Sequence, residues 1–223
     1  MTLPDTTPLS VPPTSTLAVL EHPATGPLIL LLRHGARGPL PPGEAGGHVP
    51  LLPQGAAASH ALGVHLGERL VSLRTSPVLR CVQTAEALGL GAGRAEPAVP
   101  DTALGGPGAF VLDSRLAWES WQRLGHRGVM SALVAGQHLP GFAVPMDAAT
   151  RLVRHLVDLS RGRPGVHVAV SHDSLLVATI AHTLGGPLPH AEWPTFLEAL
   201  ALVPGDGQLT VIWRDRVRVL PWS

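Results

Sequence analysis

The sequence predicts an α/β fold with a mainly parallel sheet between two helical layers. Residues 28–32 (LILLL) form an uninterrupted apolar run whose length is typical of a strand buried on both faces. Two further segments alternate strand, turn and helix: residues 71–75 precede a helix at 77–88, and residues 166–171 precede a helix at 174–184. Because parallel strands are joined by such crossover helices, the alternation favours a three-layer α/β/α arrangement.

The composition is that of a globular protein with one main domain. The chain has 223 residues, of which 45% are hydrophobic and 14% charged, and this is enough apolar material for a sizeable core. We expect residues 1–27 to form an extended or flexible lead-in, because prolines interrupt them throughout, and residues 28–223 to form a single domain.

The first expected elements surround the apolar run. Residues 16–21 (TLAVLE) are expected to add a short edge strand. Residues 38–53 contain Pro and Gly throughout and are predicted to form a loop. A mostly apolar stripe at helical spacing then predicts a helix over residues 54–70.

The middle of the chain contains one strong helix signal. Ser76 and Pro77 are predicted to begin the helix at 77–88 as its N-cap and first helical residue. Residues 98–99 could form a short strand within a loop rich in Gly, Pro and Ala. Residues 113–124 have weak helical character.

The last third is predicted more firmly. Residues 147–161 are expected to form a helix that Asp147 caps, since an apolar stripe at helical spacing follows it. Residues 209–213 and 217–220 resemble two strands of a final hairpin.

Composition also excludes several function classes. Sixteen basic and sixteen acidic residues cancel, so the overall charge gives no reason to expect a nucleic acid or an anionic membrane as partner. All the basic residues are Arg, and without Lys or Tyr the chain has no phosphate-loop lysine, Schiff-base lysine or tyrosine nucleophile. The single cysteine, Cys81, cannot form an internal disulfide, and no signal peptide or membrane-spanning run is visible, so we expect a cytoplasmic protein.

Arginine and histidine side chains follow the ends of three predicted strands, at residues 28–32, 71–75 and 166–171. The carboxyl ends of parallel strands meet at one edge of a sheet, and open α/β sheets bind ligands at that edge. Two arginines that flank one imidazole are typical of an oxyanion site, most simply a phosphate site. The side chains expected to surround this anion are Arg33, His34, Arg37, Arg80 and His172.

Three segments resemble the motifs of one family. Residues 33–39 read RHGARGP, residues 76–88 read SPVLRCVQTAEAL, and residues 171–176 read SHDSLL. In this order, each at a predicted strand end, they resemble the histidine phosphatase superfamily, which includes phosphoglycerate mutases and acid phosphatases. The first and last motifs are most similar to those of the acid phosphatase branch. The resemblance implies a phosphoglycerate mutase-like fold, with residues 28–223 as the catalytic domain.

The resemblance also implies residue roles. His34 would attack phosphorus and become a phosphohistidine, and Asp173 would protonate the leaving oxygen and then activate water. An imidazole nucleophile divides one difficult displacement into two easier ones, and arginine forks suit a phosphoryl group. The implied activity is hydrolysis of a small-molecule phosphomonoester, without a metal or any other cofactor. The groups that would bind the phosphoryl oxygens are Arg33, Arg37, Arg80 and His172.

The proton donor and the reaction type have alternatives. In size the chain is closer to the mutase branch, whose general acid is a Glu between the two histidines, so Glu119 or Glu44 could replace Asp173. We favour Asp173 because it adjoins a matching His. The alternative functions are a mutase-like phosphotransferase and a catalytically silent phosphate-binding scaffold.

A metal-dependent site is disfavoured by the sequence. No group of His, Cys, Asp and Glu has the spacing of a zinc site. The His-Asp pair could also belong to a metal-dependent phosphohydrolase, but that fold is all-helical, and strands precede both motif histidines.

Other conspicuous residues have structural interpretations. Trp118 and Trp121 are expected in the core, or lining a substrate pocket, and Cys81 is expected to be an inert core residue. The loops at 40–53 and 90–141 are expected to determine specificity, but the sequence specifies neither the substrate nor the oligomeric state. Three alternating arginines are predicted to form a solvated strand face: Arg214, Arg216 and Arg218.

Overall fold

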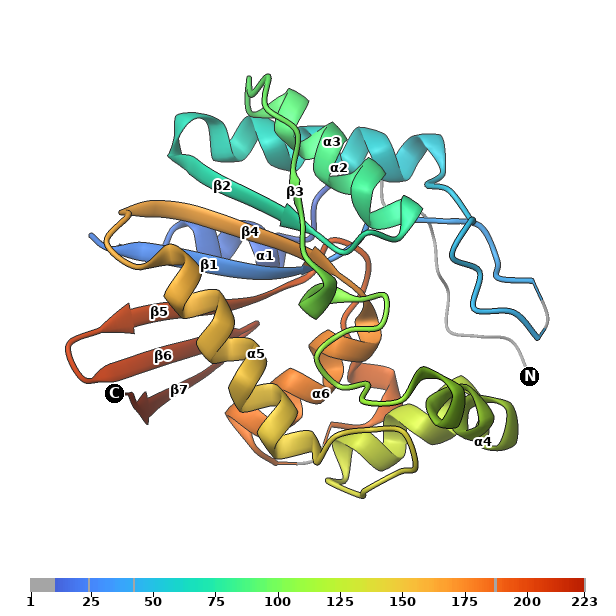
Figure 1. Ribbon diagram of the computed structural model, residues 1–223. Helices are drawn as coiled ribbons and strands as arrows, with labels where there is room; N and C mark the ends of the chain where they lie inside the picture. Colours follow the sequence, from blue (N-terminus) through green and yellow to red (C-terminus); the bar gives the residue numbers. More distant parts are fainter. Residues whose placement is uncertain (1–10, 24, 42, 187, 223) are drawn as a thin grey trace.

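The computed structural model describes residues 11–222 apart from residues 24, 42 and 187. In this part of the chain a seven-stranded sheet runs in the order β3-β2-β4-β1-β5-β6-β7 (Figure 1). The strands are β1 (Pro27–Arg33), β2 (Leu70–Thr75), β3 (Val99–Pro100), β4 (Gly165–Ser171), β5 (Ala199–Gly205), β6 (Gln208–Trp213) and β7 (Arg216–Pro221). The first four are parallel, and β5 to β7 are antiparallel to their neighbours. The predicted mainly parallel core of an α/β fold is confirmed.

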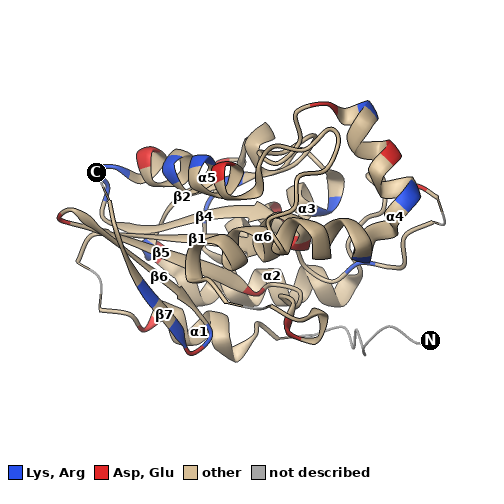
Figure 2. Cartoon of the chain, turned by 90° about the horizontal axis from the view of Figure 1, so that it is seen from below, with Lys and Arg blue, Asp and Glu red and all other residues tan. Residues whose placement is uncertain are grey.

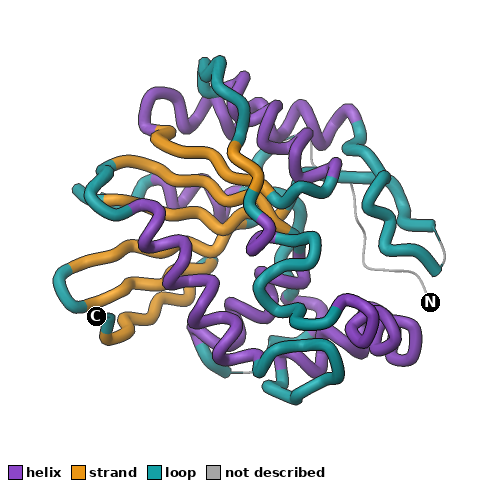
Figure 3. The backbone as a smooth tube through the Cα atoms, in the orientation of Figure 1, coloured by secondary structure: helices purple, strands orange, loops and turns teal. Residues whose placement is uncertain are grey.

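Helices cover both faces of the sheet (Figure 3). One face carries α1 (Thr14–Leu20), α2 (Pro53–Leu66) and α3 (Leu79–Gly91). The other carries α4 (Ser114–Val134), α5 (Pro145–Ser160) and α6 (Asp173–Leu184). Short 3₁₀ turns lie at Gly67–Arg69, Thr102–Leu104 and His190–Glu192.

Strand β1 is buried on both faces, as its apolar run predicts. Leu28, Leu30 and Leu32 pack into the core with α1, α2 and α3. Ile29 and Leu31 point the other way, into the core with α4, α5 and α6. Since successive side chains of a strand alternate between faces, one short run of aliphatic residues joins both halves of the core.

The strand register aligns the motif-bearing ends. β4 lies between β1 and β2, with Arg33 opposite Ser171 and Thr75 opposite Val170. The three strands are parallel, so all three carboxyl ends open on one edge of the sheet, as predicted.

The expected edge strand at residues 16–21 is wrong, because these residues belong to helix α1. Thr16, Val19 and Leu20 lie three and four positions apart and are buried together, which is a helical spacing. The Thr16 hydroxyl donates to the Leu197 carbonyl oxygen at 2.8 Å and ties the helix to the sheet layer. Of the predicted lead-in at 1–27, residues 1–10 lie outside the described residues.

Several helix boundaries differ from the prediction, including the ends of α3 at Gly91 rather than residue 88 and of α4 at Val134 rather than residue 124. α2 ends at Leu66 rather than residue 70, because Gly67 adopts a left-handed conformation and Leu70 already belongs to β2. α3 begins after Val78, so Ser76 is not its cap. α5 begins after Val144 with Pro145 in its first turn, and Asp147 lies inside that turn instead of capping it.

Strand β5 is missing from the sequence-based prediction. It pairs antiparallel with β1 and so completes the burial of that strand on its second side. Four of the seven residues in its sequence, ALALVPG, are Ala, Pro or Gly, which are poor strand formers. Pairing with β1 outweighs that local preference.

The three alternating arginines of the last hairpin are a solvated face only in part, because Arg218 is exposed whereas Arg214 and Arg216 are half-buried. Arg214 forms a bidentate ion pair with buried Glu198, with N–O distances of 2.6 and 2.9 Å. Arg216 and Arg218 donate to the Gly185 and Thr183 carbonyl oxygens at the end of α6. Figure 2 shows basic segments of the chain, in blue, along β7. Cationic side chains at a helix C-terminus satisfy its free carbonyls and its dipole.

Candidate active site

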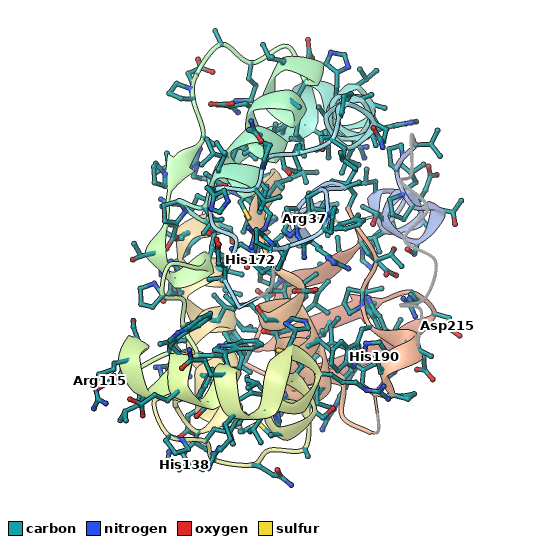
Figure 4. All side chains as sticks on the ribbon, turned by 90° about the vertical axis from the view of Figure 1, so that its right-hand side faces the viewer. Arg37, Arg115, His138, His172, His190 and Asp215 are labelled. Atoms are coloured by element: carbon teal, nitrogen blue, oxygen red, sulfur yellow. The ribbon has the colours of Figure 1, made fainter. Side chains whose placement is uncertain are left out.

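The motif segments are joined at the sheet edge by backbone hydrogen bonds. The His34 N–H donates to the Ser171 carbonyl oxygen at 2.9 Å, and the Ser76 N–H donates to the Val170 carbonyl oxygen at 2.9 Å. The segments after β1, β2 and β4 are thereby held side by side, with His172 in the middle segment. In Figure 4 the labelled His172 and Arg37 lie near the centre of the molecule.

His34 is buried, with 2% of its surface exposed, and its tautomer is fixed. Its Nδ1 lies 2.8 Å from the Gly35 carbonyl oxygen, which can only accept, so Nδ1 carries the proton. The other nitrogen, Nε2, accepts from Nε–H of Arg80 at 3.1 Å. Burial, together with the charges of Arg33 and Arg80, holds the pKa of His34 well below its ordinary value. The ring is therefore neutral, with a lone pair on Nε2 available for attack on an electrophile.

His172 lies beside this ring, at 5.6 Å between centroids. The Arg80 Nη2 group donates to its Nδ1 at 3.2 Å, so Nε2–H donates to the Ser76 hydroxyl oxygen at 3.0 Å. Burial and the nearby Arg80 lower the pKa of His172 to about 3.

Arg80 connects the two imidazoles. It is in the first turn of α3 and is buried, and its third nitrogen, Nη1, donates to the Gly46 carbonyl oxygen at 2.9 Å. Its pKa is lowered, mainly by burial. The fork of Arg80 thus contacts His34, His172 and the loop that follows β1.

Arg33 and Arg37 contain buried donors without partners. In the described part of the chain, neither Nε–H group has a hydrogen-bond acceptor. Arg33 is held by the Pro194 carbonyl oxygen and by the face of the Phe196 ring, 4.2 Å from its guanidinium carbon. Burial, and then the charge of Arg80, lowers the pKa of Arg37 to about 10. Buried, unpaired cationic donors of this kind are satisfied by a bound anion.

Asp173 is the acidic group among these cations. Its Oδ2 lies 3.1 Å from Arg33 Nη2 and 3.8 Å from His126 Nε2, while Oδ1 accepts from the Ser174 N–H at 2.8 Å. Burial alone would raise the pKa of Asp173, but the charges of Arg33 and His126 hold it well below its usual range. The free site therefore contains a carboxylate.

Glu44 and Glu119 contact neither motif histidine. Glu44 lies 3.9 Å from His48, and its side chain is 55% exposed. Glu119 pairs with Arg115 at 2.6 Å, and Figure 4 shows Arg115 at the outer edge of the molecule. Of the three carboxylates proposed from the sequence, the structure brings Asp173 together with the arginines and histidines.

Three polar residues of the second motif have contacts that the sequence did not reveal. The Ser76 hydroxyl oxygen accepts a hydrogen bond from Nε2–H of His172. The Thr84 hydroxyl accepts from the Gly35 N–H at 2.9 Å, and Gln83 Oε1 accepts from the Leu51 N–H at 2.8 Å. The QTA sequence of the motif was the available signal, but spacing alone does not specify which backbone groups it binds.

The packing around these residues is close. A Cβ on Gly35 would lie 2.9 Å from both the Gly55 carbonyl oxygen and the Ser59 hydroxyl, so this glycine allows α2 to approach the His34 segment. Cys81 is buried, and burial raises its pKa to about 12. Its Sγ packs 3.6 Å from Nε2 of His172.

Two features of other kinds of site are absent from the described residues. These residues contain no group of three or more His, Cys, Asp and Glu side chains that could hold a metal ion. They also contain no helix with the length and apolar character needed to cross a membrane.

Comparison with known families gives one match. The family model of the histidine phosphatase superfamily (branch 1) matches residues 29–203. This range includes all the site residues described above, namely Arg33, His34, Arg37, Arg80, His172 and Asp173. The likeness of the first and last motifs to the acid phosphatase branch stays a prediction. No curated protein matches the chain.

Solved structures share the fold. A phosphoserine phosphatase mutant from Entamoeba histolytica in complex with phosphoserine has a TM-score of 0.57 and 15% identity, covering 85% of this chain and 97% of that one. A mycobacterial glucosyl-3-phosphoglycerate phosphatase complexed with VO3 has a TM-score of 0.53 and 23% identity, covering 87% and 98%. Bacillus stearothermophilus YhfR has a TM-score of 0.58 and 19% identity, covering 86% and 98%.

Proposed function

The chain belongs to the histidine phosphatase superfamily and is an enzyme of the phosphatase type; we propose that it hydrolyses small-molecule phosphomonoesters through a phosphohistidine at His34. Asp173 is the proton donor, and no metal takes part. One observation carries the proposal: the Nε2 lone pair of a neutral, buried His34 lies beside buried arginine donors that need an anion. We assign this activity to residues 28–223 as one catalytic domain, because strands β1 to β7 form one sheet.

The first step is attack by Nε2 of His34 on phosphorus. The Nε–H groups of Arg33 and Arg37 bind phosphoryl oxygens. Arg80 and His172 complete the set of donors, and His172 does so by exchanging its Nε2–H bond to Ser76 for one to a phosphoryl oxygen. As phosphorus approaches Nε2, the hydrogen bond from Arg80 to this atom is exchanged for one to a phosphoryl oxygen. The Gly35 carbonyl keeps Nδ1 protonated and becomes a stronger partner as positive charge develops on the ring.

Asp173 transfers the proton in both steps. A bound phosphate offsets the arginine charges that depress the pKa of Asp173, so the pKa rises and the carboxyl group can hold a proton for the leaving oxygen. Once that proton is transferred, the carboxylate is the base that takes a proton from the water attacking the phosphohistidine. In this mechanism the guanidinium groups supply the charge stabilisation that a metal ion supplies elsewhere.

The class of substrate is supported by two structural neighbours. One is complexed with phosphoserine and the other with VO3, a phosphate-like anion. We propose a small phosphomonoester for this chain, in the cytoplasm, where a protein with a single cysteine needs no disulfide.

The test is turnover of 4-nitrophenyl phosphate with EDTA present. We expect EDTA to leave the rate unchanged and His34→Ala to abolish it, whereas His65→Ala on α2, the matched control, retains it. A phosphate group should appear on His34 after a rapid base quench. Phosphate transfer to an added alcohol instead of water would indicate the phosphotransferase alternative, and binding of vanadate without turnover would indicate the silent scaffold; either result contradicts the proposal.

A further inference from the structure

His126 is held at the mouth of the site by a break in α4. Gly125 adopts φ 67° and ψ 172°, so α4 consists of two helical segments that meet at this residue. Beyond the break, the His126 ring stacks on Trp121 at 5.3 Å and 18°. In a continuous helix two residues five positions apart lie about 140° apart around the axis, on different sides. The left-handed glycine therefore allows this stacking.

A second aromatic residue restrains the same ring. Trp193, next to the 3₁₀ turn His190–Glu192, lies edge-on to His126 at 6.2 Å and 77°. Trp193 is itself contacted by His190 at 4.5 Å. Two tryptophans from distant parts of the chain thus fix the orientation of His126. Trp121, which the sequence places in the core or lining a pocket, stacks on one face of the His126 ring.

The orientation aims one nitrogen of His126 at the proposed proton donor. Its Nε2 lies 3.8 Å from Oδ2 of Asp173, the oxygen that also contacts Arg33. The His126 side chain is 52% exposed, so its ring extends from the Asp173 carboxylate to bulk water. Proton-transfer contacts in free enzymes are often long and shorten when substrate binds.

We propose that His126 is the proton relay between solvent and Asp173, an inference that rests on the proposed function of Asp173. Protonated His126 gives its Nε2 proton to the Asp173 carboxylate, and Asp173 then passes a proton to the leaving ester oxygen. The products are an alcohol, neutral His126 and the Asp173 carboxylate. When water attacks the phosphohistidine, its proton passes to Asp173 and on to neutral His126, which exchanges it with bulk water.

The surroundings explain why such a relay is useful. The cations around Asp173 lower its pKa, so this carboxyl group is ionised in the free enzyme and must gain a proton before it can donate one. An imidazole holds a proton closer to neutral pH than a carboxylate does. The charged and titratable groups near His126 in the described contacts are Asp173 of α6, Arg33 at the end of β1, and His190 behind Trp193. Since His126 acts through Asp173, it is a positioning residue.

The test compares leaving groups. Nitrophenolate departs without an added proton, whereas the alkoxide of β-glycerol phosphate needs one. A general acid contributes about 10²–10⁴ in rate, so we expect His126→Gln to lower kcat/KM for β-glycerol phosphate by about tenfold or more. We expect a change of less than about threefold for 4-nitrophenyl phosphate. The matched control is His190→Gln. His190 belongs to the same aromatic cluster, but the contact to Asp173 comes from His126, so this variant should leave kcat/KM unchanged for both esters.

Three further measurements separate the relay from a structural role. Imidazole added to His126→Ala should restore turnover of β-glycerol phosphate, and the acid side of the kcat/KM profile should shift in His126→Gln. Because residues that act as a unit are not additive, the double variant with Asp173→Asn should be no slower than Asp173→Asn alone. An equal loss with both esters, or no rescue by imidazole, would show that His126 only packs.

The relay and the proposed function can fail separately. If Asp173→Asn slows β-glycerol phosphate selectively but His126→Gln does not, Asp173 is still the donor and the relay is wrong. If Asp173→Asn affects neither ester, the assignment of Asp173 fails, and the relay fails with it.

Discussion

The Nε–H of Arg80 points at Nε2 of His34 across 3.1 Å, so the guanidinium group contacts the atom that would attack phosphorus. In the free site this bond keeps Nε2 unprotonated, because Arg80 can only donate. Once a phosphoryl group arrives, the same N–H is free for an oxygen of that group. Arg80 therefore prepares the nucleophile before binding and stabilises the phosphoryl charge after it.

Arg80→Lys tests this double role. A lysine ammonium cannot span His34, His172 and the Gly46 carbonyl together, so we expect kcat/KM for 4-nitrophenyl phosphate to fall by about 10²–10³, the loss typical of one oxyanion donor. Arg115→Lys, on the exposed side of α4, is the control. A loss under about threefold in Arg80→Lys would mean that charge alone, without the fork, is sufficient.

Arg37→Met should separate stability from binding. The Arg37 guanidinium is half-buried, its Nε–H is buried without a partner among the described residues, and its pKa is already lowered to about 10. Removing this cation should therefore leave the melting temperature in anion-free buffer unchanged or higher. The stabilisation of the wild-type protein by vanadate, about 2.7 kcal/mol at one hundred times Kd, should shrink. Thermal unfolding with and without vanadate measures both effects. A variant that is less stable without anion but equally stabilised by it would contradict this role.

His172 should make the folded state sensitive to acid. Its pKa is lowered from 6.5 in an unfolded chain to about 3 in the fold, so below pH 6.5 the unfolded chain binds the extra proton. Stability therefore decreases as the pH falls from about 6.5 toward 3, at up to about 1.4 kcal/mol per pH unit from this group.

The measurement is urea unfolding of wild type and His172→Gln between pH 7 and pH 4. The variant should show a flatter dependence of the free energy of unfolding on pH. Some dependence will persist, since the pKa of His34 is also well below its ordinary value because of burial. Parallel curves for the two proteins would show that His172 is not held neutral.

The sequence predicted the parts of the site that lie in local motifs. His34, Arg80 and His172 each follow a predicted strand, and parallel pairing brings such ends together. Tertiary packing, and not the local sequence, decides the conformation of two other elements. The prediction lacks β5 because its sequence is rich in poor strand formers. It assigns α1 as a strand because the six-residue segment at 16–21 is ambiguous on its own.

His126 could not have been predicted. Its nitrogen reaches Asp173 only because Gly125 breaks α4 and two tryptophans fix the ring, and no local pattern contains that geometry. The roles of Arg216 and Arg218 are similar: the alternation on β7 was visible, but the carbonyls they satisfy belong to α6.

Thr84 gives the last prediction, because one hydroxyl supports both the fold and the nucleophile. It accepts from the Gly35 N–H at 2.9 Å and donates to the Arg80 carbonyl oxygen at 2.7 Å, and it is fully buried. Thr84→Val keeps the shape but leaves the Gly35 N–H unsatisfied, which should cost about 1–3 kcal/mol of unfolding free energy.

The effect on turnover should follow from the same residue, Gly35. Gly35 also supplies the carbonyl that binds Nδ1–H of His34, so in Thr84→Val kcat should fall while KM for 4-nitrophenyl phosphate changes little. Thr84→Ser retains the hydroxyl and should restore kcat even if the lost methyl group costs some stability. If Thr84→Val kept the wild-type kcat while Thr84→Ser were slow, the methyl packing, and not the hydrogen bond to Gly35, would be what holds His34 in its attacking tautomer.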